Sequence, residues 1–281
     1  MSCADHRFVF IGGLHRSGTT AVCKLIGAHP QASRLTDTGK IEDEGQFLQS
    51  VYPVDAALGG EERFALNPEA HMTESSPLLQ GAGQRLFQSW APYWDLSKPL
   101  LCEKTPANMI RSRFLQAAFP GASFIFVSRH PVACALAIRK WEYRLYRAPL
   151  ALLIRNWIAC HCIMTEDLPY LKRALVIRYE ELTADPVAGA RAIEQFLGLT
   201  PGLDPSRLRS GLNAPYFDVW SKRTFRKGPQ RWRNLLKRVW CEAEARYIEA
   251  RYERAINAFG YSFADTVGVM PGHVTAAAAE P

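Results

Sequence analysis

The sequence predicts an α/β protein built in three layers, in which a parallel β-sheet is flanked by helices. Short apolar segments, three of them rich in aromatic or β-branched residues, are typical of buried strands. Segments with a helical pattern separate them, and parallel strands need crossover connections of this kind. The strands are expected at residues 7–11, 100–102, 123–127 and 174–178.

The expected helices place apolar residues on one side. The first covers residues 20–29 and the second residues 110–119, and each is followed directly by a proline. A longer helix is expected over residues 150–173. The last covers residues 232–259 and would pack on the domain through Leu236, Val239, Trp240, Ala243 and Tyr247.

The length and composition are those of a folded protein with one large core. The chain has 281 residues, of which 48% are hydrophobic, and this excludes a disordered or fibrous chain. We expect a single domain over residues 1–265 and a flexible C-terminal tail over residues 266–281. No apolar run approaches the roughly 20 residues of a membrane span, and the start is unlike a secretory signal. Seven scattered cysteines fit free thiols, so a cytoplasmic location is expected.

The charge favours an anionic ligand without naming it. The net charge is +7, and 25 Arg against 9 Lys supply planar guanidinium groups that suit phosphate or sulfate. Nucleic acid or a solvated basic surface would fit the charge equally well. The segment Cys160-His161-Cys162 is not expected to bind a metal, because a helix would send its two sulfurs to different faces.

Basic residues follow three of the expected strands. Arg16 lies in the loop after the first strand, Lys104 follows the second, and Arg129 follows the third. Ligands of open parallel sheets bind beyond the carboxyl ends of the strands. These cations are therefore expected to meet at one edge of the sheet.

The loop after the first strand has the glycine spacing of a phosphate-binding P-loop. Gly13 and Gly18 lie between strand and helix, where backbone N–H groups and the helix N-terminus bind an anion. The Lys that follows the second glycine in nucleoside triphosphatases is Thr19 in this chain, and the cation is Arg16 inside the loop. The fold is thus expected to be of the P-loop nucleotide-binding type, with a shorter anion at the 5′ side of a nucleotide.

The segment Gly13-Leu-His-Arg-Ser-Gly-Thr-Thr20 resembles the 5′-phosphosulfate loop of sulfotransferases, especially tyrosylprotein sulfotransferases and their bacterial relatives. Residues 124–131 are similar to the 3′-phosphate segment of that family. Its members transfer a sulfuryl group from 3′-phosphoadenosine 5′-phosphosulfate (PAPS) to a hydroxyl or amine, without a metal. The resemblance implies that the donor is bound by Arg16, Ser17, Gly18, Thr19, Thr20, Arg129, Tyr179, Arg226, Lys227 and Gly228.

The resemblance also implies catalytic roles. Lys104 would contact the bridging oxygen of the leaving group, while Arg16 and the loop hold the phosphosulfate. In tyrosylprotein sulfotransferases a Glu after the P-loop helix takes the proton of the acceptor, and Glu44 falls nearest to it. A local insertion leaves Glu42 as an alternative base, and His71 is another because cytosolic sulfotransferases use a His.

Two further features of the sequence concern the binding of anions. The position eight residues after Arg129, a Ser in the family, is Ala137, so one oxyanion contact is missing or replaced. Residues 219–241 carry eight bases and no acid, which is either a solvated helix face or a surface for an acidic acceptor.

The predicted function is sulfuryl transfer from PAPS to an acceptor hydroxyl. A small molecule, glycolipid or oligosaccharide is favoured over protein tyrosine, and neither nucleic acid nor a metal is expected as a partner. Two alternatives remain open: a P-loop nucleotide kinase or other nucleoside triphosphatase, and a non-catalytic polyanion-binding protein.

Overall fold

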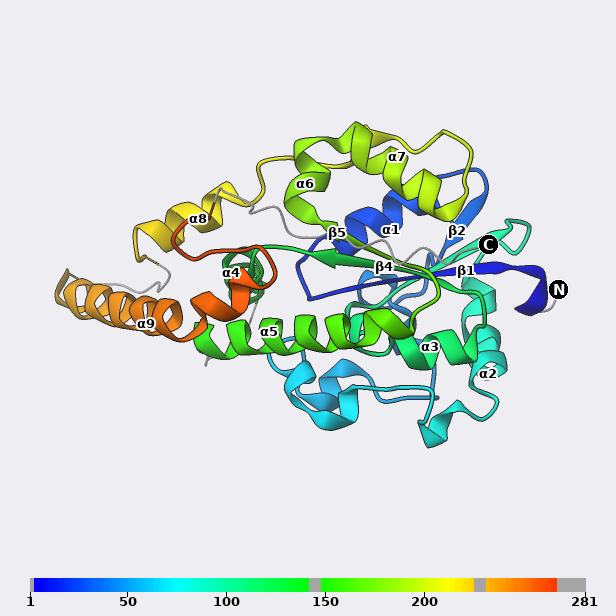
Figure 1. The fold of residues 1–281 in the computed structure, drawn as a ribbon, viewed down its shortest axis with the longest axis horizontal. Helices are drawn as coiled ribbons and strands as arrows, with labels where there is room; N and C mark the ends of the chain where they lie inside the picture. The colour runs from blue at the N-terminus through cyan, green and yellow to red at the C-terminus, as the bar shows by residue number, and fades with distance from the viewer. Residues whose placement is uncertain (1–2, 142–147, 225–230, 267–281) are drawn as a thin grey trace.

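The fold was analysed in a computed structural model, which describes residues 3–141, 148–224 and 231–266. The described residues form a five-stranded parallel sheet in the order β2-β3-β1-β4-β5 (Figure 1). The predicted α/β class is therefore confirmed. The strands are β1 Arg7–Gly13, β2 Ala32–Arg34, β3 Leu100–Lys104, β4 Ser123–Ser128 and β5 Ala174–Arg178.

Two differences from the expected strands matter for the site. Strand β2 was not predicted, because its three residues, Ala-Ser-Arg, carry no apolar pattern and lie at the sheet edge. Strand β3 continues for two residues beyond Cys102, so Glu103 and Lys104 belong to the strand and are buried. The sequence had placed both residues in the following loop.

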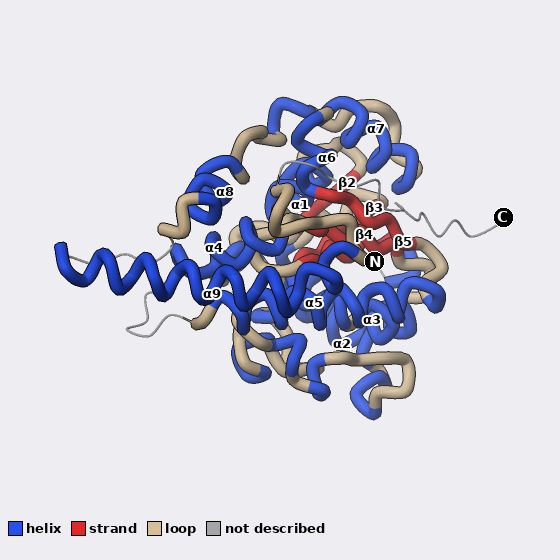
Figure 2. The backbone as a smooth tube through the Cα atoms, turned by 60° about the vertical axis from the view of Figure 1, so that its left-hand side comes forward, coloured by secondary structure: helices blue, strands red, loops and turns tan. Residues whose placement is uncertain are grey.

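Helices cover both faces of the sheet (Figures 1 and 2). In β1, Val9 and Ile11 pack with α1, α6 and α7 on one face, while Phe8 and Phe10 pack with α2, α3 and α5 on the other. This alternation is the period of a β-strand buried on both faces. The helices are α1 Thr19–Gly27, α2 Ala82–Trp90, α3 Ser112–Ala118, α4 Pro131–Trp141, α5 Leu150–Asp167, α6 Tyr179–Ala184, α7 Pro186–Leu197, α8 Ala214–Ser221 and α9 Arg231–Asn257.

Several expected helix bounds were too generous. Helix α5 ends at Asp167 because Pro169 cannot continue the hydrogen-bonding pattern, and a 3₁₀ turn over Leu168–Tyr170 leads to β5. Helix α3 begins at Ser112, since the preceding Pro106–Ile110 forms a 3₁₀ turn of its own.

The predicted core face of α9 is wrong. Val239, Trp240 and Tyr247 are exposed by 59%, 63% and 54%, and Ala243 is exposed too. The side chain of Leu236 lies outside the described residues. The helix instead packs against the domain through Cys241, Ala245, Ile248, Tyr252 and Ile256.

This buried series starts with small residues, which allow the helix to approach α5 closely. Apart from Thr266, the expected C-terminal tail lies outside the described residues. None of the described helices combines the length and the apolar character that crossing a bilayer requires.

Candidate active site

The glycine-rich loop joins the central strand β1 to α1, as predicted. A Cβ atom on Gly13 would lie 2.6 Å from both Ser17 Oγ and the Val127 carbonyl oxygen. Gly18 has a φ of +106°, and a Cβ there would lie 2.6 Å from the ring of Tyr179. These two positions therefore require glycine for steric reasons and, at Gly18, also for backbone conformation.

The loop holds hydrogen-bond donors that could bind an anion. Ser17 Oγ is buried and has no hydrogen-bond partner among the described residues. Helix α1 has no side-chain cap at its N-terminus, so its first N–H groups face the loop. Buried polar atoms are rarely left unpaired, and the arrangement fits a phosphate or sulfate group at this position.

Arg129 joins the loop to two further segments. Its guanidinium donates 2.6 Å to the Arg16 carbonyl and 2.7 Å to Asn213 Oδ1. It also stacks on the ring of Tyr179, 4.7 Å from the ring centroid, and burial raises the pKa of that tyrosine. The structure thus brings together Arg16, Gly18, Arg129 and Tyr179, which the sequence had assigned to donor binding.

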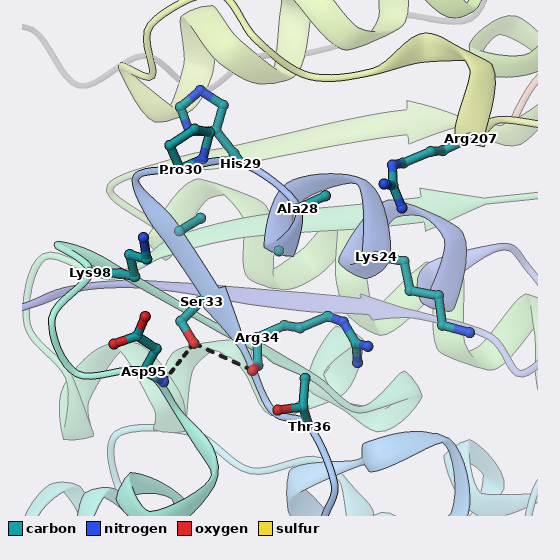
Figure 3. A pocket seen from close by; sticks show the side chains of 12 residues that line it. Lys24, Ala28, His29, Pro30, Ser33, Arg34, Thr36, Asp95, Lys98 and Arg207 are labelled. Atoms are coloured by element: carbon teal, nitrogen blue, oxygen red, sulfur yellow. Dashed lines mark hydrogen bonds between the residues drawn. The ribbon is translucent and has the colours of Figure 1, made fainter.

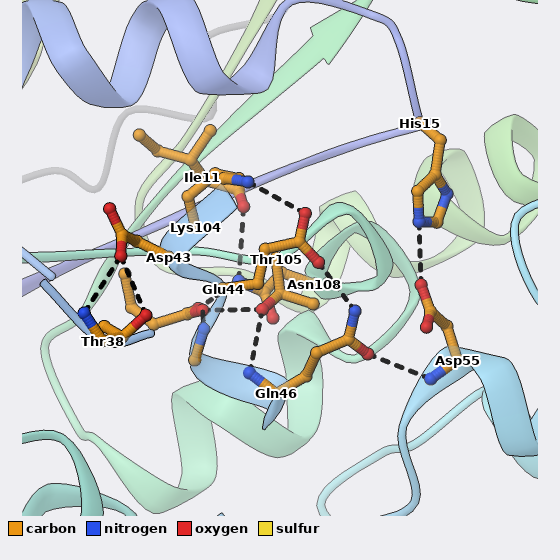
Figure 4. Close-up of polar contacts among 12 residues, drawn as sticks. Ile11, His15, Thr38, Asp43, Glu44, Gln46, Asp55, Lys104, Thr105 and Asn108 are labelled. Carbon is orange, nitrogen blue, oxygen red and sulfur yellow. Dashed lines mark hydrogen bonds and ion pairs between the residues drawn. The ribbon is translucent and has the colours of Figure 1, made fainter. Parts of the chain in front are cut away.

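Glu44 and Lys104 form a buried ion pair beside the loop. Lys104 Nζ donates to Glu44 Oε1 at 2.9 Å, and the two residues are only 3% and 5% exposed. Gln46 Nε2 donates to the other carboxylate oxygen at 2.8 Å (Figure 4). Glu42, the alternative base, is exposed and lies in a turn with a φ of +53°. The ion pair with Lys104 supports Glu44 as the base, while Glu42 lines a small cavity that Lys104 also lines.

Glu103 fixes the segment that carries Glu44. Its carboxylate accepts hydrogen bonds from the Gly45 N–H, the Thr105 hydroxyl and the Asn108 amide. Burial raises the pKa of Glu103 in spite of these hydrogen bonds. The carboxylate ties the turn after Glu44 to the end of β3, so the position of Glu44 is set by the sheet.

His71 lies elsewhere. Its Nε2 is 3.1 Å from Asp167 at the C-terminal end of α5, and Arg113 contacts the same carboxylate. Asp167 leads to the amino end of β5, whereas the glycine-rich loop follows the carboxyl end of β1. The geometry therefore does not support His71 as a base at the loop.

His15 and Asp55 form a further pair that was not predicted from the sequence. His15 lies within the glycine-rich loop, and its Nε2 is 2.8 Å from Asp55 Oδ2. One ring nitrogen of His15 and one carboxylate oxygen each of Asp55 and Glu44 lie within 4.8 Å of one another. The available signal was a histidine between the loop glycines; its partner is 40 residues away and could not be recognised from the sequence.

Other expected residues divide into described and undescribed ones. Arg226, Lys227 and Gly228 lie outside the described residues. Ala137 is buried in α4, and its methyl group offers no hydrogen-bond donor. In the basic segment, Lys222 pairs with Asp218, which lies just before that segment.

The Cys160-His161-Cys162 segment lies in α5, and the side chains of Cys160 and His161 are buried in the core. His161 stacks on Trp157 and lies 2.9 Å from Ser128 Oγ, and burial lowers the pKa of His161 to about 3. Cys160 is buried against Met109, whereas Cys162 is only half-buried.

Two neighbouring cavities extend from Lys104 along α1 and β2. The smaller one, of about 50 Å³, is lined by Thr20 and Lys104, by the carboxylates Glu42 and Asp43, and also by Lys24 and Arg34. The larger, of about 540 Å³, shares those last two cations (Figure 3). We call its basic lining the edge groove; its cations are Lys24, Arg34, Lys98 and Arg207.

The fold is thus a parallel α/β sheet whose central strand leads into a glycine-rich loop, with Thr19 where nucleoside triphosphatases have a lysine. A family model described as "Sulfotransferase family" matches residues 9–204. The chain therefore belongs to the sulfotransferase family.

Curated relatives include protein-tyrosine sulfotransferase 2 of Gallus gallus, 26% identical over 203 residues, or 68% of this chain and 51% of that protein. Protein-tyrosine sulfotransferase A of Caenorhabditis elegans is 27% identical over 197 residues, or 68% of this chain and 50% of that protein. The chain thus spans about half the length of the curated relatives it matches.

Among solved structures, a sulfotransferase of Mycobacterium tuberculosis is 16% identical with a TM-score of 0.48, covering 72% of this chain and 70% of that one. A mouse sulfotransferase complexed with PAP is 16% identical with a TM-score of 0.41, covering 87% of this chain and 85% of that one.

Proposed function

We propose that this protein transfers a sulfuryl group from PAPS to the hydroxyl group of an acceptor. The observation that carries the proposal is the buried Glu44–Lys104 pair, whose lysine lines a small cavity together with Thr20 of the glycine-rich loop. We call this loop, residues 13–20, the donor loop. A base and a cation in contact with each other and next to an anion-binding loop are what this transfer needs.

The donor would be held by Ser17, by the N-terminus of α1 and by Arg129, whose partners on Arg16 and Asn213 fix its orientation. When bound, PAPS supplies a sulfuryl group activated by its link to phosphate. Family membership and the orphaned Ser17 hydroxyl support this choice of donor over a nucleoside triphosphate, since Thr19 replaces the triphosphatase lysine.

Glu44 would take the proton from the acceptor hydroxyl, and Lys104 would place positive charge at the oxygen that leaves with the phosphate. Both side chains are shielded from water, where charges interact more strongly than in bulk solvent. Positioning and electrostatics would supply most of the catalysis, as they do in phosphoryl transfer. No metal is part of this proposal.

The acceptor in this proposal is a hydroxyl compound that carries negative charge. The edge groove supports this through Lys24 and Lys98, because its other two cations, Arg34 and Arg207, already contact the carboxylates of Asp43 and Asp204. An acidic oligosaccharide fits the expectation of a carbohydrate, glycolipid or small-molecule acceptor. The names of the curated relatives concern protein tyrosine, so an acidic tyrosine peptide is the necessary comparison. The cytoplasmic location stays a prediction.

The experiment combines ligand binding with turnover. Thermal shifts with adenosine 3′,5′-bisphosphate, with ATP and Mg²⁺, and with heparin distinguish the sulfotransferase from the two alternatives. We expect stabilisation by the bisphosphate and labelled transfer from PAPS to a uronic-acid oligosaccharide, in preference to a neutral sugar. Stabilisation by ATP with Mg²⁺ but not by the bisphosphate would support a kinase instead, and binding without any transfer would support a polyanion-binding protein.

A further inference from the structure

His15 and Asp55 form a pair that the mechanism above does not use. His15 lies in the donor loop, where its ring packs edge-on against Phe64 with 5.6 Å between the ring centroids. Its Nε2 is 2.8 Å from Asp55 Oδ2, and the Asp55 side chain is 6% exposed. The binding of an anion by the loop does not require the contact between His15 and the buried carboxylate of Asp55, so the pair calls for another role.

Two hydrogen bonds connect the backbone of Asp55 to the proposed base through the side chain of Gln46. The backbone N–H of Asp55 donates to Gln46 Oε1 at 3.0 Å, and Gln46 Nε2 donates to Glu44 Oε2 at 2.8 Å. Lys104 donates to the other oxygen of Glu44 (Figure 4). Gln46 is fully buried, so its amide has a fixed orientation with its oxygen toward Asp55 and its nitrogen toward Glu44.

The charges around His15 favour its protonated form. Burial lowers the pKa of His15, but the hydrogen bond and charge of Asp55 and the charges of Glu44 and Glu61 outweigh burial and raise it. Burial raises the pKa of Asp55, but the hydrogen bond and charge of His15, the hydrogen bond of Gln46 and the charge of Arg111 outweigh burial and lower it. Lys104 faces Glu44, and the Arg16 charge acts on Glu61, where burial nevertheless raises the pKa. These charges therefore favour the ionic form of the pair.

We propose that the His15–Asp55 pair is a positioning element that fixes Glu44 relative to the donor loop through Gln46. This inference rests on the proposed function. His15 and Asp55 connect the loop that holds the donor to the segment that carries the base. The donor itself is held by other groups, namely Ser17 and Arg129. Loss of the pair should therefore reduce turnover rather than donor affinity.

The test compares His15→Gln and Asp55→Asn with His71→Gln, a matched control that breaks a second His–Asp pair away from the loop. We expect H15Q and D55N to lower kcat by about 10- to 100-fold, the range that misplacement of a reacting group produces. The dissociation constant of adenosine 3′,5′-bisphosphate should stay unchanged. In the pH profile of the wild type, kcat should also fall above the pKa of His15, and this fall should be absent from the profile of H15Q.

A readout without turnover separates this inference from the proposed function. The NMR titration of the His15 ring, assigned by its loss in H15Q, should shift to lower pKa in D55N and also in E44Q. If the wild type transferred no sulfuryl group, the proposed function would fail while this titration still tested the link. Unchanged kcat in H15Q, a parallel loss of kcat and bisphosphate affinity, or a titration insensitive to E44Q would each overturn the positioning role.

Discussion

Removing Lys104 should destabilise the fold and abolish turnover together, because its ammonium is the partner of a buried carboxylate. In Lys104→Ala, Glu44 keeps the Gln46 hydrogen bond at 2.8 Å but loses the ion pair at 2.9 Å, in a site where the two residues are 3% and 5% exposed. Leaving one member of a buried pair costs about 3–5 kcal/mol. The retained Gln46 contact places the expected loss near the lower end of that range.

The assay is urea unfolding together with a thermal melt. For a chain of 281 residues, a loss of about 3 kcal/mol lowers Tm by about 5 °C, from an unfolding entropy of about 2.1 cal/mol/K per residue. The double variant Lys104→Met with Glu44→Gln removes both charges and should recover much of the stability without recovering turnover. Additive losses in the double variant, or an unchanged K104A, would refute the reasoning that these two charges depend on each other.

Three further predictions concern the loop and the core. Ser17→Ala should leave Tm unchanged and weaken the binding of adenosine 3′,5′-bisphosphate by about 2- to 10-fold in calorimetry, since the buried Ser17 hydroxyl has no hydrogen-bond partner among the described residues. Unchanged affinity would contradict this. Gly18→Ala, which forces a Cβ against Tyr179, should weaken the binding of the same ligand about 10-fold or more. The control Gly39→Ala, at a φ of +65° with nothing within 4 Å of its Cβ, should not weaken it. Equal effects of the two substitutions would argue against the steric role of Gly18. His161 has a folded-state pKa of about 3 against an ordinary 6.5, so on acidification the unfolded state takes up the proton before the folded state does. The stability that neutral His161 contributes is therefore complete above pH 6.5 and is lost as the pH falls towards 3. Urea unfolding at pH 4 to 5.5, between the two pKa values, should show a slope of about 1.4 kcal/mol per pH unit from this residue. The slope should be absent from His161→Gln, and an equal slope in both proteins would disprove the prediction.

The parts of the site that the sequence predicted are those encoded locally. The spacing of Gly13 and Gly18 is set by the tight turn, which leaves no space for a Cβ, and turn geometry depends on neighbouring residues only. The resemblance to sulfotransferases supplied Glu44 and Lys104, and tertiary structure places them in contact at 2.9 Å.

The parts that were missed depend on contacts between distant segments. Asp55 is an ordinary acid in a loop until the fold brings it to His15. Strand β2 forms because β3 offers an edge to three residues without a strand pattern of their own. In α9, Val239 and Trp240 have the apolar character of core residues, but packing against α5 selects the neighbouring face with Cys241 and Ala245. Periodicity does not distinguish two apolar faces of one helix.

The most direct test of the central claim is labelled sulfuryl transfer from PAPS by the wild type and by Glu44→Gln, with bisphosphate affinity measured in both. We expect the wild type to sulfate an acidic hydroxyl acceptor. We expect E44Q to bind the bisphosphate equally well but to lose about 100-fold or more in kcat, the contribution of a general base. Transfer by E44Q at the wild-type rate, or a wild type that binds the bisphosphate without transferring sulfate to any acceptor, would contradict the assignment of Glu44 as the base of a sulfotransferase.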